Sequence, residues 1–500
     1  MKRAMSAWFI CGFAWACSSS EGTPAPGTGG GNTSGGSATG GSVSGGSVSG
    51  SAGASSTSAG AGGSNGSGGS AGQTAAGGAA SAAGTSGMAT TGGSGGNTGS
   101  GGDGGSSPTA GGSSGAPGGG GSGGSSPAVD VAFCTTALDA AAAQFVGFRT
   151  TYTNPNNVPR AAKNGQVTSV ALGDWTSGFP GGSLWLVYEY TKDPAFRTAA
   201  ESFTAALESQ KNNAADHDVG FRFMSTFGNA HRLVGGDNYL NVLKTAAATL
   251  ATRFRSAPKV IESWGDAQWD CPVIIDNMMN LHLWYYVAEK GGDQNLITLA
   301  NQHAETTLKN HFRPDGSSFH LVNYNSTTGA VIGKQTVQGL ANGSPWARGQ
   351  SWGLYGYTES FVSTQKAEYL AQAQKIADYL IAQPNMPEDK VPYWDYDAPT
   401  TPGTPTPRDS SAAAIMASGL IQLSGLVAEP ARSKYRDFAL DVLRSLSSPA
   451  YAAALGQNNH FLLMHSTGHL PANSEIDVAI NYADYYYLEA LLRCRGLAAP

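Results

Sequence analysis

The sequence has little charge and no concentration of positive charge. Charged residues make up 13% of the 500 residues and the formal net charge is −6, whereas an average soluble domain has about 25% charged residues. No run of Lys or Arg is present, so a nucleic-acid partner is not expected. An anionic ligand would have to be bound by a few local cations and hydrogen-bond donors.

The sequence also lacks the patterns of metal and phosphate sites. No pair among the five cysteines has metal-ligand spacing, and the histidines are scattered. The glycines concentrate in a low-complexity segment, and none form a phosphate loop between a strand and a helix. We therefore predict that the protein uses no metal and no cofactor.

Residues 1–17 have the pattern of an export signal. Lys2 and Arg3 precede an apolar run, residues 4–16, that is too short to span a bilayer. The run ends at Cys17 in a sequence that resembles a bacterial lipoprotein cleavage site, although Leu is usual three residues before the Cys. We predict an exported protein, periplasmic or at the cell surface, anchored to a bacterial membrane by a lipid on Cys17. A plain cleaved signal peptide is the alternative.

Residues 18–127 are almost entirely Gly, Ser, Ala and Thr. With almost no charged or large apolar side chains, they cannot bury enough surface to offset the loss of chain entropy. We predict a disordered linker here. Residues 128–500 are expected to form one domain, because no second linker interrupts them.

The domain has the pattern of an all-α protein. Apolar residues recur at helical spacing in about twelve segments that Gly, Pro and Asn/Asp separate. The segments are 137–148, 184–190, 195–207, 219–233, 239–254, 273–287, 296–311, 347–361, 367–381, 412–426, 435–446 and 478–492. Residues 318–322 and 330–332, on either side of a turn, predict a β-hairpin. The pattern favours paired helices closed into a ring; a helical solenoid is the alternative, although no fixed-period repeat supports it.

One carboxylate has an unusual position in this pattern. Asp276 directly follows the apolar residues 273–275 and directly precedes a helical pattern. Burial there would raise its pKa and let it hold a proton at neutral pH, as a general acid must. A helix N-cap is the alternative, because Asp is a favoured cap.

Six motifs in order give the sequence a more specific likeness. They are Asp216-His217-Asp218-Val219-Gly220-Phe221, Ile275-Asp276-Asn277-Met278-Met279-Asn280, Gln338-Gly339 with Trp346-Ala347-Arg348-Gly349-Gln350-Ser351-Trp352, Tyr393-Trp394-Asp395-Tyr396-Asp397, Arg408-Asp409-Ser410-Ser411, and Tyr482-Ala483-Asp484-Tyr485-Tyr486. Together they resemble the unsaturated glucuronyl hydrolases, glycoside hydrolase family 88, over residues 175–493. The resemblance implies an (α/α)6 toroid with a central pocket.

The resemblance also implies a reaction. Polysaccharide lyases leave a C4=C5 double bond in a terminal uronic acid, and these hydrolases hydrate that enol ether so that the product falls apart. The ligands would be unsaturated uronic-acid oligosaccharides. By the same likeness Asp276 is the general acid/base and Asp218 the second carboxylate. Mutual repulsion is expected to raise one of the two pKa values and leave the other low, although a helix cap is the alternative for Asp218 as well.

The resemblance assigns five residues to substrate binding. His320, Gln338 and Arg348 would hold the polar groups of the sugar, and Trp352 and Trp175 would pack against its apolar face. Each has a structural alternative that the residues themselves leave open. His320 could be a structural hydrogen-bonding residue, Arg348 could pair with an internal carboxylate, and Trp352 could belong to the core.

Two other functions remain open at this point. The related unsaturated rhamnogalacturonyl hydrolases share the toroid and an Asp/His pair, but the Gln338 to Arg348 spacing argues for the glucuronyl enzymes. A catalytically inactive, tethered sugar-binding protein is the third possibility. The presence of both Asp218 and Asp276 argues against it.

Three cysteines lie in the expected domain. Cys134 is near the start of its first helix and Cys494 near the end of its last. In a closed ring those helices are neighbours, so a disulfide could join them in an exported protein. The alternative is three buried free thiols, because sequence does not establish the Cα separation that a bridge needs.

Overall fold

The computed structural model describes residues 130–497. The predicted signal segment 1–17 and linker 18–127 lie outside the described residues. The outer helices are α1 (Ala132–Thr151), α3 (Pro194–Leu207), α6 (Asp237–Ala251), α8 (Asn295–Asn310), α10 (Ala367–Ile381) and α12 (Ala431–Leu446). The inner ones are α2 (Phe179–Thr191), α4 (Val219–Phe223) with η2 (Met224–Gly228) and α5 (Asn229–Val234), α7 (Asn277–Glu289), α9 (Ala347–Thr364), α11 (Ser410–Ser424) and α13 (Asn481–Gly496).

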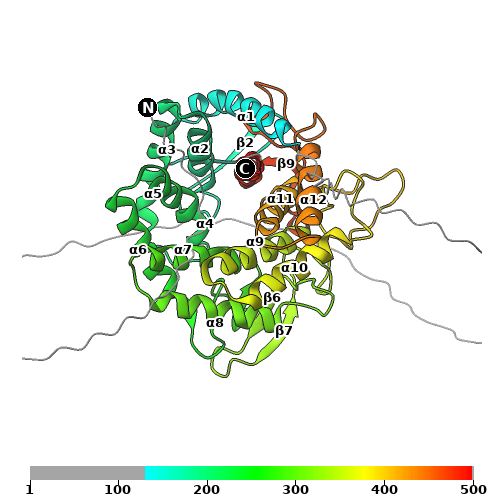
Figure 1. The fold of residues 1–500 in the computed structure, drawn as a ribbon. Helices are drawn as coiled ribbons and strands as arrows, with labels where there is room; N and C mark the ends of the chain where they lie inside the picture. Colours follow the sequence, from blue (N-terminus) through cyan, green and yellow to red (C-terminus); the bar gives the residue numbers. More distant parts are fainter. Residues whose placement is uncertain (1–129, 498–500) are drawn as a thin grey trace, which may run out of the picture. The chain divides into compact units, whose positions relative to one another are not determined.

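The inner helices close into a ring (Figure 1). In turn, α2 packs on the η2 segment, α4 on α7, α7 on α9, α9 on α11, α11 on α13, and α13 on α2 again. The segments α4, η2 and α5 follow one another without a break, so they count as one helix with a π turn in it, and the described residues contain twelve helices. The predicted (α/α)6 toroid is confirmed, and the solenoid alternative is wrong.

Burial explains which helices lie inside. The central helices α9 and α11 bury nearly every residue, and α11 is rich in Ala, Ser and Gly, which lets neighbouring helices approach closely. An outer helix such as α12 buries only residues three or four apart, including Tyr435, Ala439 and Leu443, as an amphipathic helix on a core does. None of the described helices is long and apolar enough to cross a membrane.

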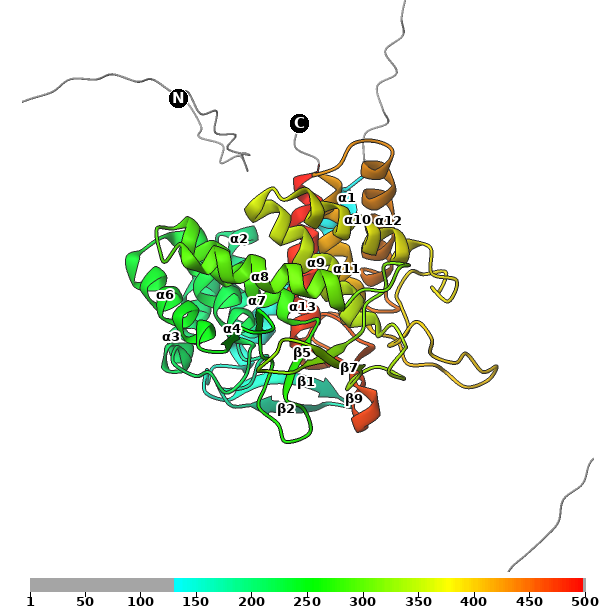
Figure 2. The same cartoon turned by 90° about the horizontal axis from the view of Figure 1, so that it is seen from below.

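Short antiparallel strands gather at one end of the ring (Figure 2). One sheet has the order β2 (Gln166–Val170), β1 (Val158–Lys163), β9 (Ser474–Ile480), β8 (Ser466–His469), and another has the order β5 (Cys271–Ile274), β6 (Leu321–Tyr324), β7 (Val331–Gln335). A third is the pair β3 (Phe254–Arg255) and β4 (Val260–Ile261). Strand β5 leads into α7 and β9 leads into α13, so this end carries the starts of inner helices.

The strands confirm one prediction and correct two others. The predicted hairpin is β6 and β7, with β5 as a third strand. Residues 273–274 and 478–480 are strand rather than helix, and the helices begin at Asn277 and Asn481. Periodicity does not separate a short, fully buried apolar strand from a buried helical turn, which explains both errors.

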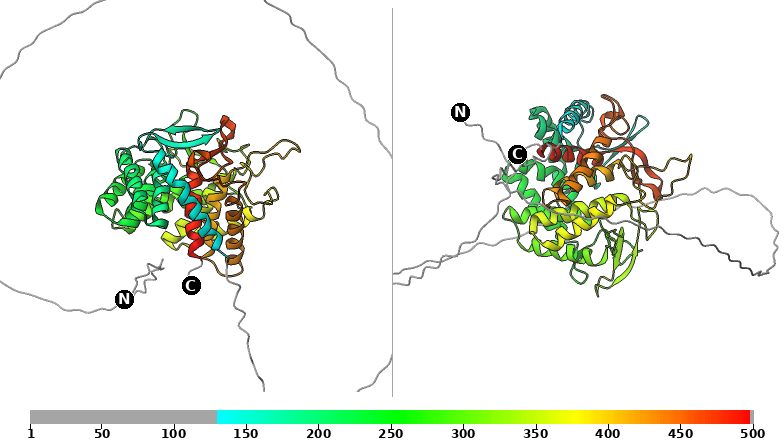
Figure 3. Two further views of the ribbon diagram at one scale, coloured as in Figure 1. Left: turned by 90° about the horizontal axis from the view of Figure 1, so that it is seen from above. Right: turned by 45° about the vertical axis from the view of Figure 1, so that its right-hand side comes forward.

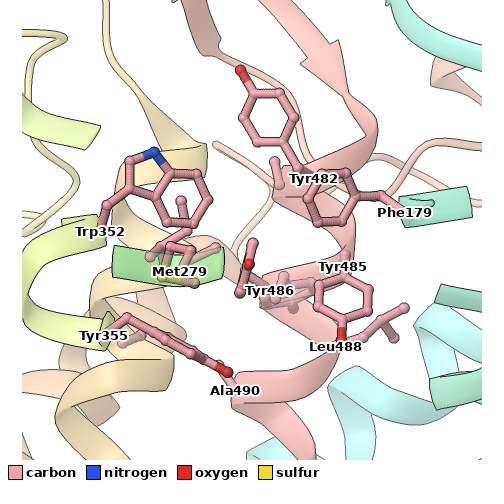
Figure 4. Close-up of a cluster of buried hydrophobic side chains, with 14 of the residues drawn as sticks. Phe179, Met279, Trp352, Tyr355, Tyr482, Tyr485, Tyr486, Leu488 and Ala490 are labelled. Carbon is pink, nitrogen blue, oxygen red and sulfur yellow. The ribbon is translucent and has the colours of Figure 1, made fainter. Parts of the chain in front are cut away.

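Aromatic side chains fill the interior of the ring. Figure 4 shows Phe179 from α2, Trp352 and Tyr355 from α9, and Tyr482, Tyr485 and Tyr486 from α13. The ring centroids of Trp352 and Tyr486 are 5.3 Å apart, and those of Phe179 and Tyr485 are 5.4 Å apart. The barrel is therefore a packed core below the site rather than a channel.

A disulfide joins the first and last helices. Cys134 of α1 and Cys494 of α13 are bonded, with their Cα atoms 6.3 Å apart and a sequence separation of 360. Figure 3 shows α1 beside α13, and Cys271 is a buried free thiol. The predicted bridge is confirmed, and the alternative of three free thiols is wrong.

Thiol counting on the denatured, unreduced domain (residues 128–500) should therefore find one free thiol, that of Cys271. A count of three would contradict the bridge. Replacing both Cys134 and Cys494 by Ala should lower the free energy of unfolding by as much as about 5 kcal/mol, because the bridge closes a very long loop in the unfolded chain. Cys271→Ala is the control, since it removes a buried thiol outside the bridge.

Candidate active site

A cavity of about 290 Å³ opens at the strand end of the ring. Its volume is at the small end of the range for small-molecule sites, which suits one or two sugar rings. Four of the five predicted binding residues line it: Trp175, His320, Gln338 and Arg348. Its other lining residues are Arg160, Trp264, Val337, Gly468, His469, Ser474, Glu475 and Tyr482.

Asp276 adjoins this cavity through His320. The backbone N–H of Ile275 donates to the carbonyl of His320 (2.9 Å), which places the next residue, Asp276, beside the imidazole. Asp276 stands at the N-cap position of α7, yet its side chain makes no capping hydrogen bond, unlike Asp193 before α3. The cap-only interpretation is therefore wrong.

The proton on His320 can be placed from its neighbours. Its Nδ1 accepts from the backbone N–H groups of Val337 (3.0 Å) and Gln338 (3.3 Å), so in the neutral ring the hydrogen is on Nε2. Burial lowers the pKa of His320 to about 3, with the charge of Arg348 adding to the effect, so the ring is neutral at ordinary pH. His320 Nε2 lies 3.8 Å from Asp276 Oδ2. Among the described residues neither atom has a hydrogen-bond partner, so both are available to a substrate.

Asp218 comes from the neighbouring inner helix. It stands at the N-cap position of α4, again without a capping hydrogen bond. A Cβ on Gly220 would come within 2.5 Å of the Asn280 Cα, so only glycine lets α4 approach α7 this closely. Asn280 uses that approach: its Oδ1 accepts from the Phe221 N–H (3.1 Å), and its Nδ2 lies 3.4 Å from Asp218 Oδ1.

Both carboxyl groups have raised pKa values, which corrects the expectation that one would stay low. Burial raises the pKa of Asp276 to about 7, with nearby His217 acting against it and the charge of Asp218 adding to it. Burial, together with Asp216, raises the pKa of Asp218 to about 8. Desolvation acts on both groups at once and outweighs their nearby cations.

Arg348 forms an internal ion pair and is also part of the cavity wall. Its Nη1 donates to Asp409 Oδ2 (2.7 Å) and to the carbonyl of Thr467 (2.6 Å), and its Nη2 donates to the carbonyl of Gly468. Asp409 also caps α11 through the N–H groups of Ser411 and Ala412. The structural alternative for Arg348 is thus confirmed, although Arg348 also lines the cavity.

The two predicted tryptophans have different positions. Trp175 is partly exposed and lines the cavity. Trp352 is fully buried and is not part of the lining, which corrects the expectation that it stacks on the sugar. It packs on Phe221 (5.0 Å between ring centroids), which in turn packs on Trp175 (5.5 Å), so Trp352 supports the wall from within the core.

Several cavity residues were not identified from the sequence. Arg160 donates to Glu475 and to Asp174, an ion-pair network that ties the first sheet to the cavity wall. Trp264 and His469 also line the cavity, and His469 Nε2 lies 3.0 Å from the Val337 carbonyl. Arg160 and Glu475 are 315 residues apart, and no local pattern marks such a pair. Only Tyr482, within the Tyr482-Ala483-Asp484 motif, had a signal in the sequence.

Among the described residues, no group of three or more His, Cys, Asp or Glu side chains is arranged to hold a metal ion. The chemistry that this arrangement offers is acid/base chemistry. The neutral imidazole of His320 lines the cavity together with Trp175 and Arg348, and the buried carboxyl group of Asp276 lies directly behind it, 3.8 Å away.

Comparisons with known proteins agree with this geometry. No protein-family model matches the chain. An unsaturated glucuronyl hydrolase from Formosa agariphila is 44% identical over 347 residues, which is 68% of this chain and 86% of the relative.

Two solved structures are also similar. One is an unsaturated glucuronyl hydrolase specific for heparin, with a TM-score of 0.70 and 42% identity, covering 72% of this chain and 96% of that one. The other is a complex with dGlcA-Glc-Rha-Glc, with a TM-score of 0.68 and 30% identity over the same shares. Identity of this degree over most of a relative's length, together with a shared fold, shows that the chain belongs to the unsaturated glucuronyl hydrolase family.

Proposed function

We propose that this protein releases the terminal 4,5-unsaturated glucuronic acid from lyase-generated oligosaccharides by hydrating the C4=C5 enol ether. The observation that carries the proposal is the environment of Asp276. Its carboxyl group is buried, has a pKa raised to about 7, and lies 3.8 Å from a neutral His320, which lines a sugar-sized cavity. A carboxyl that holds a proton at neutral pH is what protonation of a carbon atom requires.

The steps then follow from the residues. Asp276 delivers its proton to C4 of the unsaturated sugar, and positive charge develops at C5 and the ring oxygen. The Asp276 carboxylate that remains takes a proton from the water that attacks C5, which regenerates the acid. The resulting hemiketal opens and releases the rest of the oligosaccharide, so the net reaction adds one water. His320 Nε2–H is placed to donate to substrate beside the carboxyl group.

Binding of an anionic sugar needs an explanation, since every arginine in the cavity wall is already paired. Arg348 pairs with Asp409, and Arg160 pairs with Glu475 and Asp174. The paired guanidiniums still supply oriented N–H groups. The inner helices α7, α9 and α13 begin at this end, and the positive ends of their dipoles favour an anion. The neutral state of Asp276 avoids repulsion of the sugar carboxylate.

The two alternative functions have less support. The relative from Formosa agariphila is named an unsaturated glucuronyl hydrolase, which favours that activity over an unsaturated rhamnogalacturonyl hydrolase. A catalytically inactive binding protein would not need two buried carboxyl groups with raised pKa values, because each costs folding free energy when it ionises.

We also propose that the protein is exported and anchored to a bacterial membrane through a lipid on Cys17. Lys2 and Arg3, the apolar residues 4–16 and the following Cys17 support this proposal. The confirmed disulfide agrees with an oxidising compartment. The Gly/Ser-rich residues 18–127 would then connect the anchor to the catalytic domain.

Asp276→Asn should fold normally and bind unsaturated disaccharide, but its kcat should fall by at least about 10²–10⁴-fold, as loss of a general acid/base does. Turnover is followed by loss of the ultraviolet absorbance of the C4=C5 bond, with chondroitin-, hyaluronan-, heparin- and gellan-type substrates. Asp193→Asn is the matched control, because Asp193 caps α3 through the Ala195 N–H. Near-normal turnover of Asp276→Asn on the preferred substrate would exclude this mechanism.

The pH dependence of kcat/KM should follow the protonation of Asp276. Asp276 must be protonated to act, and its raised pKa of about 7 keeps it protonated below that value. The kcat/KM should therefore fall as pH rises through about 7, by about tenfold per pH unit at the alkaline end, since kcat/KM reports pKa values of the free enzyme. A profile in which kcat/KM rises steadily from pH 6 to pH 8 would mean that the essential group is a base.

Lipidation can be tested on the full chain expressed in a bacterium that processes lipoproteins. Metabolic labelling with radioactive palmitate should mark the protein, and it should fractionate with membranes. Cys17→Ser should lose the label and be released from the membrane fraction, with Cys271→Ser as the control thiol. An unlabelled wild-type protein would favour the plain signal peptide.

A further inference from the structure

His217 lies next to the catalytic carboxyl groups but has no part in the steps above. Its side chain is only 2% exposed, and its Nε2 is 3.5 Å from Asp218 Oδ1. Its backbone N–H donates to the carbonyl of Ser263 (3.0 Å), which holds it against the segment before β5. The imidazole also influences Asp276, whose pKa it lowers. One ring is therefore in electrostatic contact with both carboxyl groups.

Asn277 determines which nitrogen of this ring carries hydrogen. Asn277 Nδ2 donates to the carbonyl of Ile261 (3.0 Å) and to Ser263 Oγ (2.9 Å). A carbonyl oxygen can only accept, so the amide cannot be turned the other way. Asn277 Oδ1 must then face His217 Nδ1, at 2.6 Å, and this short contact requires a hydrogen on Nδ1.

Because Nδ1–H donates to Asn277, Nε2 carries no hydrogen in the neutral ring and can accept a proton. Asp218 Oδ1 faces Nε2. Asn280 Nδ2 lies 3.4 Å from the same oxygen. A hydroxyl oxygen can accept from an amide and donate to an imidazole at once, so a protonated Asp218 satisfies all of these groups. Contacts of this length in catalytic sites often shorten when substrate binds.

We propose that His217 is a positioning residue of the proposed reaction: it shares one proton with Asp218, between Nε2 and Oδ1, while Asn277 keeps the hydrogen on Nδ1. The role of His217 in the reaction rests on the proposed function, but the position of the proton can be tested without measuring activity. The shared proton leaves the pair with no net charge. Asp218 can then face an anionic sugar without adding a full negative charge to the site.

The charged groups around the pair make this neutrality important. Asp216 and Asp174 act on it with negative charge, Arg222 and Arg253 act on it with positive charge, and Asp276 would add negative charge once it ionises. Arg222 donates to the Gly173 carbonyl and to Asp216, and Arg253 donates to the carbonyls of Glu262 and Ala214. Both arginines are held by other partners, so the proton that Asp218 shares with His217 is the direct compensation for the Asp218 charge.

Nitrogen-15 NMR of imidazole-labelled protein tests the proton's position directly. The signal that disappears in His217→Gln belongs to His217, and it should show a protonated Nδ1 throughout the pH range of activity. His303 serves as an internal reference for the opposite tautomer. Its Nδ1 accepts from the Ile261 N–H (2.9 Å), so its hydrogen is on Nε2. A His217 ring with hydrogen on Nε2 and none on Nδ1 would overturn the proposal, whatever the activity.

Kinetic measurements test whether His217 positions Asp218 for the reaction. His217→Gln should lower kcat by about 10²-fold, as a misplaced reacting group does, with little change in KM and a displaced alkaline limb of the kcat/KM profile. His303→Gln removes another buried imidazole of the same region and should leave the pH profile in place. If both variants lose Tm and kcat in parallel with unchanged profiles, His217 is merely structural and the proposal fails. An active Asp276→Asn would instead overturn the proposed function and leave the NMR result standing.

Discussion

Closure of the inner ring is the constraint on which the rest of the structure depends. Helix α13, which ends the described domain, packs between α2 and α11 and so completes a circle that began far away in sequence. Each inner helix except α13 is followed by an outer helix that returns along the outside, so the inner helices all start at the same end. The disulfide between Cys134 and Cys494 ties the first and last helices together. Without closure, α13 and the wall that Tyr482 and β9 form would not meet the rest of the site.

Desolvation gives this common end its chemistry. The aromatic core of Phe179, Trp352 and Tyr486 seals the barrel, so carboxyl groups at the helix starts are kept from water on one side. Burial then raises the pKa values of Asp276 and Asp218. The same burial keeps His320 neutral. A site made of neutral acids and a neutral imidazole is suited to an anionic sugar, because it can donate protons without repelling a carboxylate.

The arginines show how charge is controlled in such a site. Arg348 is buried against Asp409, and removing one partner of such a pair would leave an uncompensated charge in the core. Arg160 connects Glu475 and Asp174 in the same way. These pairs hold the β8–β9 wall and the start of α11 in place. Their contribution to the site is thus rigidity and oriented N–H groups rather than free positive charge.

Much of this could be predicted from the sequence, for identifiable reasons. Helical periodicity is local, so twelve helices were found, and the errors at residues 273–274 and 478–480 fell where a buried strand has the same apolar pattern. The family resemblance named Asp276, Asp218, His320, Gln338, Arg348 and Trp175, and the last four of these line the cavity. The placement of Trp352 failed because helical spacing says which residues share a face but not whether that face meets a cavity or the core.

The amino-acid pattern was sufficient for the helices, because helical periodicity depends on neighbours within one or two turns of chain, and the ordered motifs were sufficient for the family. The ion pairs and protonation states of the site depended on contacts between distant segments. The closed ring decides which distant segments meet. It brings Asp409 to Arg348, Glu475 to Arg160, and Asn277 to the His217 ring that it orients. Burial of both carboxyl groups, and hence both raised pKa values, likewise follows from packing around them. Solvent exclusion is a property of the assembled ring, and the apolar residues 273–275 before Asp276 were its local sign in the sequence.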